Sequence, residues 1–319
     1  MKFWLSRIGG ALALILTVSA ITFGAMNLLG DPLFNILGPT AGDVGNPESL
    51  EKINAAKEQF NLDEPLPIRW GLWLGDFVRG DFGPQFSATG QPPVSDLIVE
   101  RLPRSIMLLV MAQTMATLIA VPWAIWSASK ANSVADRTST VFTFMMIGMP
   151  TFALGVILKF VFAIKLDWFP LTFTANDPFW SRVYSMFLPA LTLALPVGAV
   201  YQRLLRTDLI TTLQDDFILT ARSKGVSRRN VLFKHALRPS LFSFITIFGV
   251  NTGALIGGSL VVEQIFRIPG LGSAIVEAIL REDFPVVLTI VMLVTVTFVV
   301  LNVAIDLLYS VIDPRVRAS

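Results

Sequence analysis

Apolar residues are gathered into long blocks that are separated by more polar segments. The blocks cover approximately residues 8–29, 105–128, 140–164, 186–206, 241–262 and 286–310. A hydrocarbon layer about 30 Å thick is crossed by about 20 apolar residues in a helix, and each block reaches that length. The pattern therefore predicts an all-α integral membrane protein with six membrane-spanning helices, forming one transmembrane domain over residues 1–319.

The first block also has features of a secretory signal. Lys2 and Arg7 stand at its start, and Val18-Ser19-Ala20 resembles a cleavage site. The apolar run continues to residue 29, however, whereas the apolar core of a signal peptide is about 7–15 residues long. We therefore expect this block to be retained as the first span.

The composition agrees with a membrane protein and excludes other classes. Of 319 residues, 53% are hydrophobic and 15% are charged, and the mean hydropathy is +0.65. Soluble domains average about 45–50% apolar and about 25% charged residues, and disordered chains are less apolar still. Because the chain has no cysteine, a disulfide scaffold and thiolate chemistry are excluded.

Charges predict the orientation of the spans. The loop at residues 207–240, with Arg203 and Arg206 just before it, has eight Lys and Arg against three acids, whereas the loop at 31–104 has six against eleven. Short cationic loops stay in the cytoplasm. We therefore expect both termini and the loops beginning near residues 129 and 207 to be cytoplasmic, and the large loop 31–104 to lie outside. The pI near 9.0 then reflects the orientation of the protein in the membrane and its contact with lipid. The sequence contains no cluster of basic and aromatic residues that would indicate nucleic-acid binding.

Catalytic patterns are not found in the sequence. The chain has one histidine, His235, and no G-x-x-x-x-G-K-[ST] phosphate loop. Apart from Arg203 and Arg206, which flank the inner loop, Lys159 and Asp306 are the charges inside predicted spans, where a charge is a candidate functional residue. The predicted orientation places them near opposite membrane faces, so we expect each to extend to its own interface rather than to pair.

The inner loop 207–240 is the most informative segment. Asp215 and Asp216 suit the N-terminus of a helix, and Arg222 and Lys224 suit its C-terminus. Gly225 is placed to end that helix in the left-handed conformation. The pattern predicts two short helices around a glycine turn.

Two roles are open for this loop from its residues alone. Val231 and Leu232 are expected to pack on the inner ends of the spans, which would leave Phe217, Leu219 and Ala221 available to a partner protein. Alternatively, the loop is a basic amphipathic segment that lies on anionic lipid headgroups.

Motifs in the loop resemble a known family. Thr220-Ala221-Arg222-Ser223-Lys224-Gly225 and the later His235-Ala236-Leu237-Arg238-Pro239 are similar to the cytoplasmic coupling loop of ABC-importer permeases. Leu219 stands where the general pattern has an acid, so Ala221 and Gly225 carry the match. Stretches along most of the chain add to the resemblance: Gly30-Asp31-Pro32, Glu100-Arg101-Leu102-Pro103, Val262 to Gly272, and Asp306-Leu307-Leu308-Tyr309 followed by Asp313-Pro314-Arg315. Together they resemble the B-type permease of the dipeptide, oligopeptide and nickel importers.

The resemblance implies one half of a transport pathway in the bacterial cytoplasmic membrane. Its expected partners are a second homologous permease, two ATPase subunits or domains that hold ATP and Mg²⁺, and an extracytoplasmic solute-binding protein; this chain itself is expected to bind no cofactor and no metal and to catalyse no reaction. Peptide is the expected cargo, with nickel, glutathione or haem-like ligands as alternatives. A stand-alone secondary transporter is the alternative from another class. The resemblance assigns ATPase coupling to Asp215, Asp216, Phe217, Thr220, Ala221, Arg222, Lys224 and Gly225.

Two loops on the outer side are expected to contain helices. One is predicted around Pro47–Phe60, and another after Pro269-Gly270, where Leu271 and Ile275 begin a helical spacing. Aromatic residues of the large loop are expected to serve either as interfacial anchors or as contacts for the binding protein: Trp70, Trp73, Phe77 and Phe82. Proline inside the spans, at Pro150, Pro189 and Pro196, predicts kinks or hinges.

Overall fold

The computed structural model describes residues 2–29, 32–87, 90–175 and 177–312. Every regular element in these ranges is helical, and their extended pairing is confined to an isolated bridge between Pro84 and Pro93. The predicted all-α fold class is therefore confirmed.

Several helices are long and apolar enough to cross a membrane. Within the described residues there are five such helices, or up to seven spans when two bent helix pairs are each taken as one span. The six predicted spans fall inside this range. The five helices are Arg7–Leu28, Val94–Ser129, Phe179–Thr212, Arg228–Gly253 and Phe284–Ile305.

The chain is organised as two compact units, where the sequence pattern predicts one transmembrane domain. Unit 1 comprises residues 1–103 and 270–319, and unit 2 comprises residues 104–269. Helix α5 (Val94–Ser129) begins in unit 1 and ends in unit 2. Each unit is described by itself.

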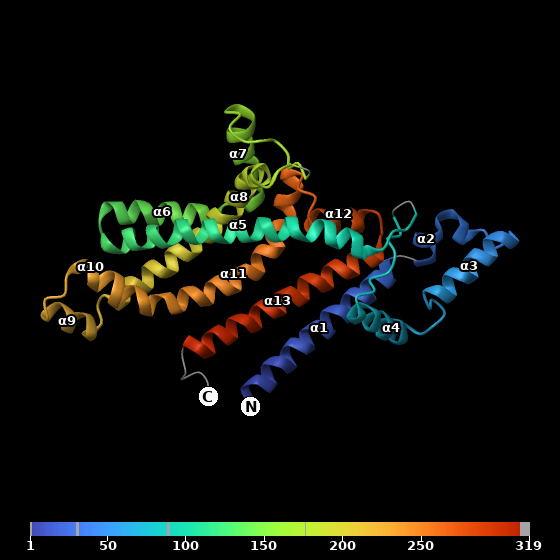
Figure 1. Cartoon of the computed structure of the whole chain (residues 1–319), viewed down its shortest axis with the longest axis horizontal. Helices are drawn as coiled ribbons and strands as arrows, with labels where there is room; N and C mark the ends of the chain where they lie inside the picture. Colours follow the sequence, from blue (N-terminus) through green and yellow to red (C-terminus); the bar gives the residue numbers. More distant parts are fainter. Residues whose placement is uncertain (1, 30–31, 88–89, 176, 313–319) are drawn as a thin grey trace. The chain divides into compact units, whose positions relative to one another are not determined.

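In unit 1, helices α1 (Lys2–Leu29) and α13 (Phe284–Ile312) run antiparallel and pack side by side (Figure 1). Helix α12 (Leu271–Leu280) packs on α13, and α4 (Leu66–Arg79) packs on α1. Buried side chains of α12, α13 and the start of α5 form a shared core that includes Ile98, Ala274, Val287 and Ile290. The predicted helix after Pro269-Gly270 is confirmed as α12.

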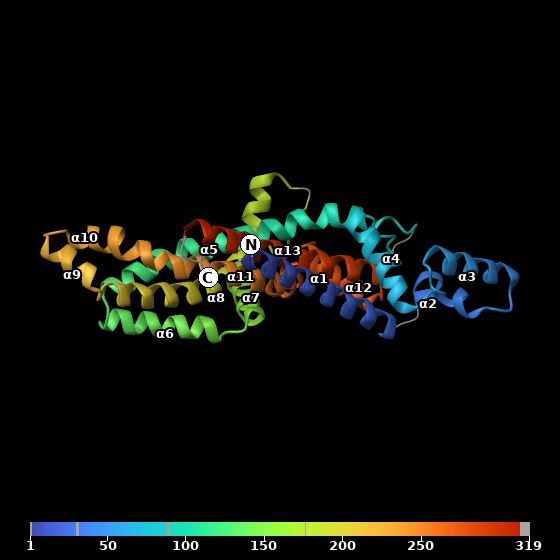
Figure 2. The same cartoon turned by 90° about the horizontal axis from the view of Figure 1, so that it is seen from below.

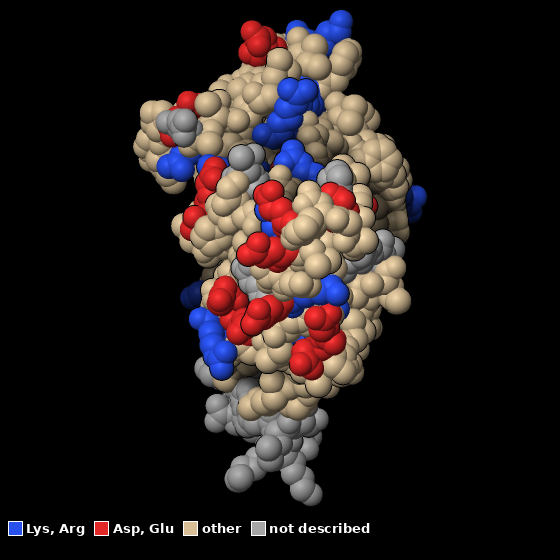
Figure 3. Space-filling view, turned by 90° about the vertical axis from the view of Figure 1, so that its right-hand side faces the viewer, with Lys and Arg blue, Asp and Glu red and all other residues tan. Residues whose placement is uncertain are grey.

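The large loop of unit 1 is mostly helical. Helix α2 (Pro32–Leu37) leads into the 3-10 turn η1 (Gly38–Gly42) and then into α3 (Pro47–Gln59), which confirms the helix predicted around Pro47–Phe60. Asn46 caps α3, because its side chain accepts a hydrogen bond from the Glu48 amide at 3.0 Å. In Figure 3, acidic and basic side chains are interspersed over the face that holds α3, as expected for a helix in water.

The sequence pattern predicted no helix at the residues that form α4 and the first turns of α5. On α4, the Trp70 indole donates a hydrogen bond to Ser19 Oγ at 3.2 Å, and the Trp73 ring lies 5.7 Å from the Phe23 ring. These two candidate anchors therefore also hold α4 against α1. The helical spacing of apolar residues in α4 is short and is interrupted by Gly71 and Gly75, and glycine lowers helix propensity. The sequence pattern therefore did not predict this helix.

In unit 2, helix α8 packs against α6, α7 and α11 (Figure 1). The bounds of its helices are α6 (Val134–Gly148), α7 (Thr151–Leu158), the π-helical turn η2 (Lys159–Lys165), α8 (Phe179–Thr212), α9 (Asp216–Ser223), α10 (Arg228–Asn230), the π-helical turn η3 (Val231–Ala236) and α11 (Leu237–Phe266).

Small residues bring α5 and α8 close together. Five buried alanines follow one another at intervals of four residues along α5: Ala112, Ala116, Ala120, Ala124 and Ala128. On α8, a Cβ placed at Gly198 would lie 3.2 Å from the Ala116 carbonyl oxygen. Small residues at this spacing allow helix backbones to approach in a membrane.

The third predicted span, residues 140–164, is not a straight helix. Helices α6 and α7 meet at Met149-Pro150 and are bent by 103° relative to each other. Proline removes an intrahelical hydrogen bond and clashes with the preceding turn, which explains the break. By contrast, α8 continues through both Pro189 and Pro196.

The two predicted intramembrane charges have different outcomes. Lys159 Nζ donates a hydrogen bond to the Ile265 carbonyl oxygen at 2.5 Å and lies 5.5 Å from the centre of the Phe266 ring. Lys159 therefore contacts the end of α11, and its predicted extension to the membrane interface stays a prediction. The Asp306 side chain and the signature at residues 313–315 lie outside the described residues.

Candidate coupling site

Helix α9 forms most of the predicted coupling segment. Asp215 stands at its N-cap in extended backbone, Asp216 lies in its first turn and Arg222 lies in its last turn. Beyond the helix, Gly225 has φ +78°, its amide donates to the Arg222 carbonyl at 2.9 Å, and the Val226 amide donates to the Ala221 carbonyl at 3.2 Å. This pair of bonds is the Schellman motif that ends helices at a left-handed glycine. The predicted helix and glycine turn are present.

The inner face of α9 is docked on the bundle. Ile218 is fully buried and Ala221 is 8% exposed. Ile218 belongs to one apolar cluster with Leu209 and Tyr201 of α8, and this cluster also includes Val231 and buried side chains of α5 and α11. Because the cluster is continuous, displacement of α9 strains the packing of α8 and α11 directly.

The outer face of α9 is exposed. Phe217 is 47% and Leu219 is 51% exposed. The remaining predicted coupling residues on this surface are Asp215, Asp216, Thr220, Arg222, Lys224 and Gly225.

Ala221 is the exception among the predicted coupling residues. We expected it to be available to a partner, but it lies three residues after Ile218 and therefore on the same, buried face of the helix. The sequence match at Ala221 is consequently explained by the need for a small side chain against the bundle.

A buried ion pair ties another loop to the same end of the bundle. Arg206 Nε and Nη2 donate to Asp136 Oδ1 and Oδ2, each at 2.6 Å, and the Asp136 side chain is 3% exposed. Asp136 also accepts hydrogen bonds from Ser127 Oγ at 2.6 Å and the Asn132 amide at 2.9 Å. The pair fixes the turn between α5 and α6 to the last turns of α8. The sequence pattern did not reveal it, because its two residues are 70 positions apart.

Figures 1 and 2 agree that α9 and α10 lie together at one end of α8 and α11. The exposed outer face of α9 therefore projects from the end of the bundle, while its inner face and the Asp136–Arg206 pair anchor that end. Chemically, the site offers an amphipathic docking surface with charges of both signs around two apolar side chains.

Residues 120–318 match the family model described as a binding-protein-dependent transport system inner membrane component. The chain belongs to this family. It is a permease of the B-type in ABC importers, and a multi-pass protein of the bacterial cytoplasmic membrane. Transport systems of this family depend on a binding protein.

The permease is similar along nearly its whole length to curated relatives. It is 35% identical over 312 residues to the oligopeptide transport system permease protein AppB of Bacillus subtilis, covering 96% of both chains. It is 37% identical to a putative peptide transport system permease protein of Brucella abortus, covering 98% of both chains. It is 33% identical to the glutathione transport system permease protein GsiC of Escherichia coli K12, covering 99% of both chains.

Besides the ion pair, buried polar contacts join helices α5, α6, α8 and α11 of the permease. Thr143 of α6 donates to Gln202 Oε1 of α8 at 2.9 Å. Gln113 of α5 donates to the Tyr201 hydroxyl of α8 at 2.7 Å and to Thr252 Oγ1 of α11 at 3.1 Å. Buried polar contacts of this kind fix the register of packed helices in a membrane. They link α5, α6, α8 and α11 to one another.

Proposed function

We propose that this permease forms half of the translocation pathway of an ATP-driven importer of peptides. The single observation that carries the coupling role is the docking of α9, which is buried on one face and exposed at Phe217 and Leu219 on the other. The names of the relatives support peptide as the cargo class. One relative is named for glutathione transport, so glutathione is the second candidate cargo.

The proposed assembly contains a second homologous permease, two ATPase subunits or domains, and an extracytoplasmic solute-binding protein. ATP and Mg²⁺ are bound by the ATPases, and the permease holds no cofactor or metal and catalyses no reaction. The sequence supports this division, since it has no phosphate-binding loop of the G-x-x-x-x-G-K-[ST] type.

The proposed mechanism is alternating access driven through α9. When ATP closes the two ATPase domains, α9 moves with them as a rigid element. Helices α8 and α11 follow α9, because Ile218 is packed in the same cluster as their side chains. The Asp136–Arg206 pair carries the movement to the start of α6. A conformational change of this kind requires that the ATPase contacts α9 differently in the two states.

Single-cysteine crosslinking tests the ATPase contact, and the cysteine-free chain needs no prior engineering. In the complete importer, Ser223→Cys is expected to crosslink to an ATPase subunit with ATP-dependent yield, because Ser223 is exposed. Ala221→Cys is the matched control: its site is 8% exposed, so little adduct is expected. A transporting complex in which Ser223→Cys reaches only lipid would contradict the docking role and favour the lipid-surface alternative.

Gly225→Val tests the angle that the glycine turn sets. Its φ of +78° disfavours any L side chain, by about 1–2 kcal/mol, while a Cβ there meets no atom within 4 Å. We therefore expect normal insertion in the membrane but reduced uptake per ATP hydrolysed. Gly225→Asn is the control, since asparagine tolerates the left-handed conformation. Equal uptake by both variants would show that the turn angle does not matter.

The cargo is tested by ATP-dependent uptake into proteoliposomes that contain the complete importer. Dipeptides, tetrapeptides and glutathione are compared as competitors of one labelled peptide. Competition by the peptides supports the proposal, competition by glutathione alone selects the second candidate, and uptake that persists without ATP contradicts an ABC importer.

A further inference from the structure

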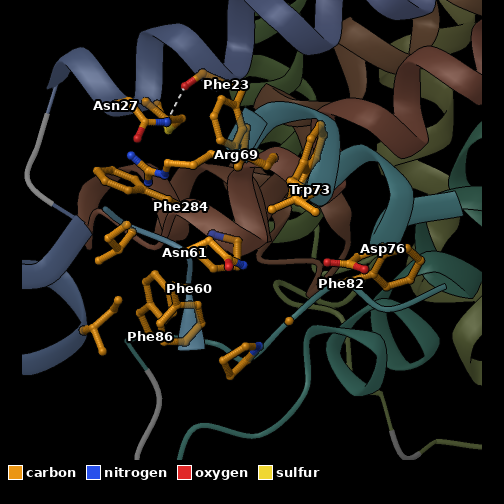
Figure 4. Close-up of a pocket in the computed structure, with 18 of the residues that line it drawn as sticks. Phe23, Asn27, Phe60, Asn61, Arg69, Trp73, Asp76, Phe82, Phe86 and Phe284 are labelled. Atoms are coloured by element: carbon orange, nitrogen blue, oxygen red, sulfur yellow. Dashed lines mark hydrogen bonds between the residues drawn. The ribbon is translucent and has the colours of Figure 1, made fainter. Parts of the chain in front are cut away.

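Unit 1 contains a cavity of about 380 Å³ (Figure 4). It is lined by the last turns of α1, by α2, by α4, by the loop segments that follow α3 and α4, and by the first turns of α13. Its volume is within the range of about 300–1,000 Å³ that small-molecule sites have. Six aromatic rings line it: Phe23, Phe60, Trp73, Phe82, Phe86 and Phe284.

Acceptor groups predominate among the polar groups in the lining. Asp76 and Asp81 contribute two carboxylates against the single guanidinium of Arg69. Asn27 Oδ1 is buried and has no hydrogen-bond partner among the described residues, while its Nδ2 donates to the Phe23 carbonyl at 2.8 Å. In Figure 4, Asn27 and Arg69 lie on the α1 side of the cavity, and Asp76 lies toward the opposite side. The cavity therefore favours a ligand that donates hydrogen bonds and carries positive charge.

Neither carboxylate is committed to a buried interaction. Asp76 pairs with Arg79 at 3.3 Å, but both side chains are more than half exposed, and such pairs contribute only about 0–1 kcal/mol. Asp81 Oδ1 accepts the Gly83 amide at 3.1 Å, and an ionised carboxylate has about four acceptor sites. Both groups can thus accept an incoming ammonium.

Aromatic faces together with carboxylates are the chemistry that recognises an ammonium group attached to an apolar body. We propose that this cavity binds the amino-terminal end of a peptide whose first side chain is large and apolar. The α-ammonium group is held by Asp76 and Asp81, the Asn27 amide oxygen accepts a hydrogen bond from a backbone N–H further along the peptide, and the first side chain lies among the rings. The inference rests on the proposed peptide function and on the outward orientation expected for the large loop.

The lining favours a water-soluble ligand over a phospholipid. Phe60, Asn61 and Leu62 follow α3, and Asp81, Phe82 and Phe86 follow α4, so these residues come from loop segments outside the apolar blocks. A phosphate group would require cations in excess, whereas the lining has two carboxylates and one guanidinium.

Two measurements on the complete importer test this site. In the first, ATP-driven uptake of Phe-Ala is compared with uptake of Ala-Ala at saturating binding protein. We expect Phe86→Ala to lower the ratio of kcat/KM for Phe-Ala over Ala-Ala by about ten-fold, and we expect Phe34→Ala to leave this ratio unchanged. Phe34→Ala is the matched control, because Phe34 lies in the same loop, is 56% exposed and does not line the cavity.

In the second measurement, a photoreactive azidophenylalanyl-alanine probe is crosslinked to the full-length permease in nanodiscs. We expect adducts within residues 60–86, and loss of these adducts when the probe is N-acetylated, because acetylation removes the ammonium charge. Labelling that ignores acetylation, or a copurified lipid that maps to the same residues, would overturn the proposal. An importer that takes up no peptide yet labels in this way would refute the peptide-import proposal while supporting the cavity as an amine site.

Discussion

Asp136→Ala is expected to destabilise the permease by about 3–5 kcal/mol, the cost of breaking a buried ion pair. Arg206 would lose both of its 2.6 Å hydrogen bonds to the carboxylate, and its side chain is 22% exposed, so water replaces them poorly. Ser127 Oγ and the Asn132 amide would lose their acceptor as well. Thermal unfolding of the full-length protein in detergent, followed by tryptophan fluorescence, measures the loss.

An exposed pair in the same chain supplies the control. Lys57 and Asp63 lie 3.4 Å apart, with side-chain exposures of 36% and 77%, so Asp63→Ala is expected to change stability by less than about 1 kcal/mol. Asp136→Glu, which keeps the charge, should retain part of the stability. Equal unfolding temperatures for Asp136→Ala and Asp63→Ala would show that the Asp136–Arg206 pair does not hold the end of the bundle together.

Destabilisation alone does not distinguish anchoring from coupling, so uptake per ATP hydrolysed is the second readout. If the pair carries movement from α8 to α6, Asp136→Asn should lower this ratio in protein that is still folded, because the neutral amide preserves the shape but not the charge. An unchanged ratio would limit the pair to a structural role.

The all-α membrane fold could be predicted from the sequence because its signal is local. A block of about 20 apolar residues reports a span wherever it occurs, and α9 with its glycine turn follows from acids at one end, cations at the other and Gly225 beyond them. A kink or hinge at Pro150 was predicted, but the 103° angle between α6 and α7 depends on how α7 packs against α8 and α11. No local sequence pattern determines that packing.

The contacts of the coupling site were only partly predictable. Once α9 is known to dock, helical spacing predicts that Ile218 and Ala221 are buried on the same face. The sequence does not show which face of the helix docks on the bundle, and Ala221 was wrongly predicted to lie on the exposed face. The Asp136–Arg206 pair joins residues of different helices, α6 and α8, and counting charges used both residues only to predict orientation. The helix α4 was hidden by its glycines and by its position between polar loops.

Ile218→Ala is expected to loosen α9 from the bundle. Ile218 is fully buried in the cluster with Leu209 and Val231, and truncating a buried isoleucine to alanine costs about 2–5 kcal/mol. Because α9 has eight residues and little else buried, the loss should appear locally. Amide hydrogen exchange over α9 is expected to accelerate at least about ten-fold, since each 1.4 kcal/mol changes the open population about ten-fold.

Leu219→Ala is the matched control, because it removes an aliphatic side chain of the same size from the next position, where 51% is exposed. Exchange over α9 should remain as in the unmodified chain, whereas ATPase binding should weaken, since the proposed contact is with the outer face. Ile218→Ala should instead keep ATPase binding and lose uptake per ATP hydrolysed, because the ATPase would then move a helix that no longer moves α8 and α11. If both variants fail in the same way, the two faces of α9 do not have separate roles, and the lever mechanism is wrong.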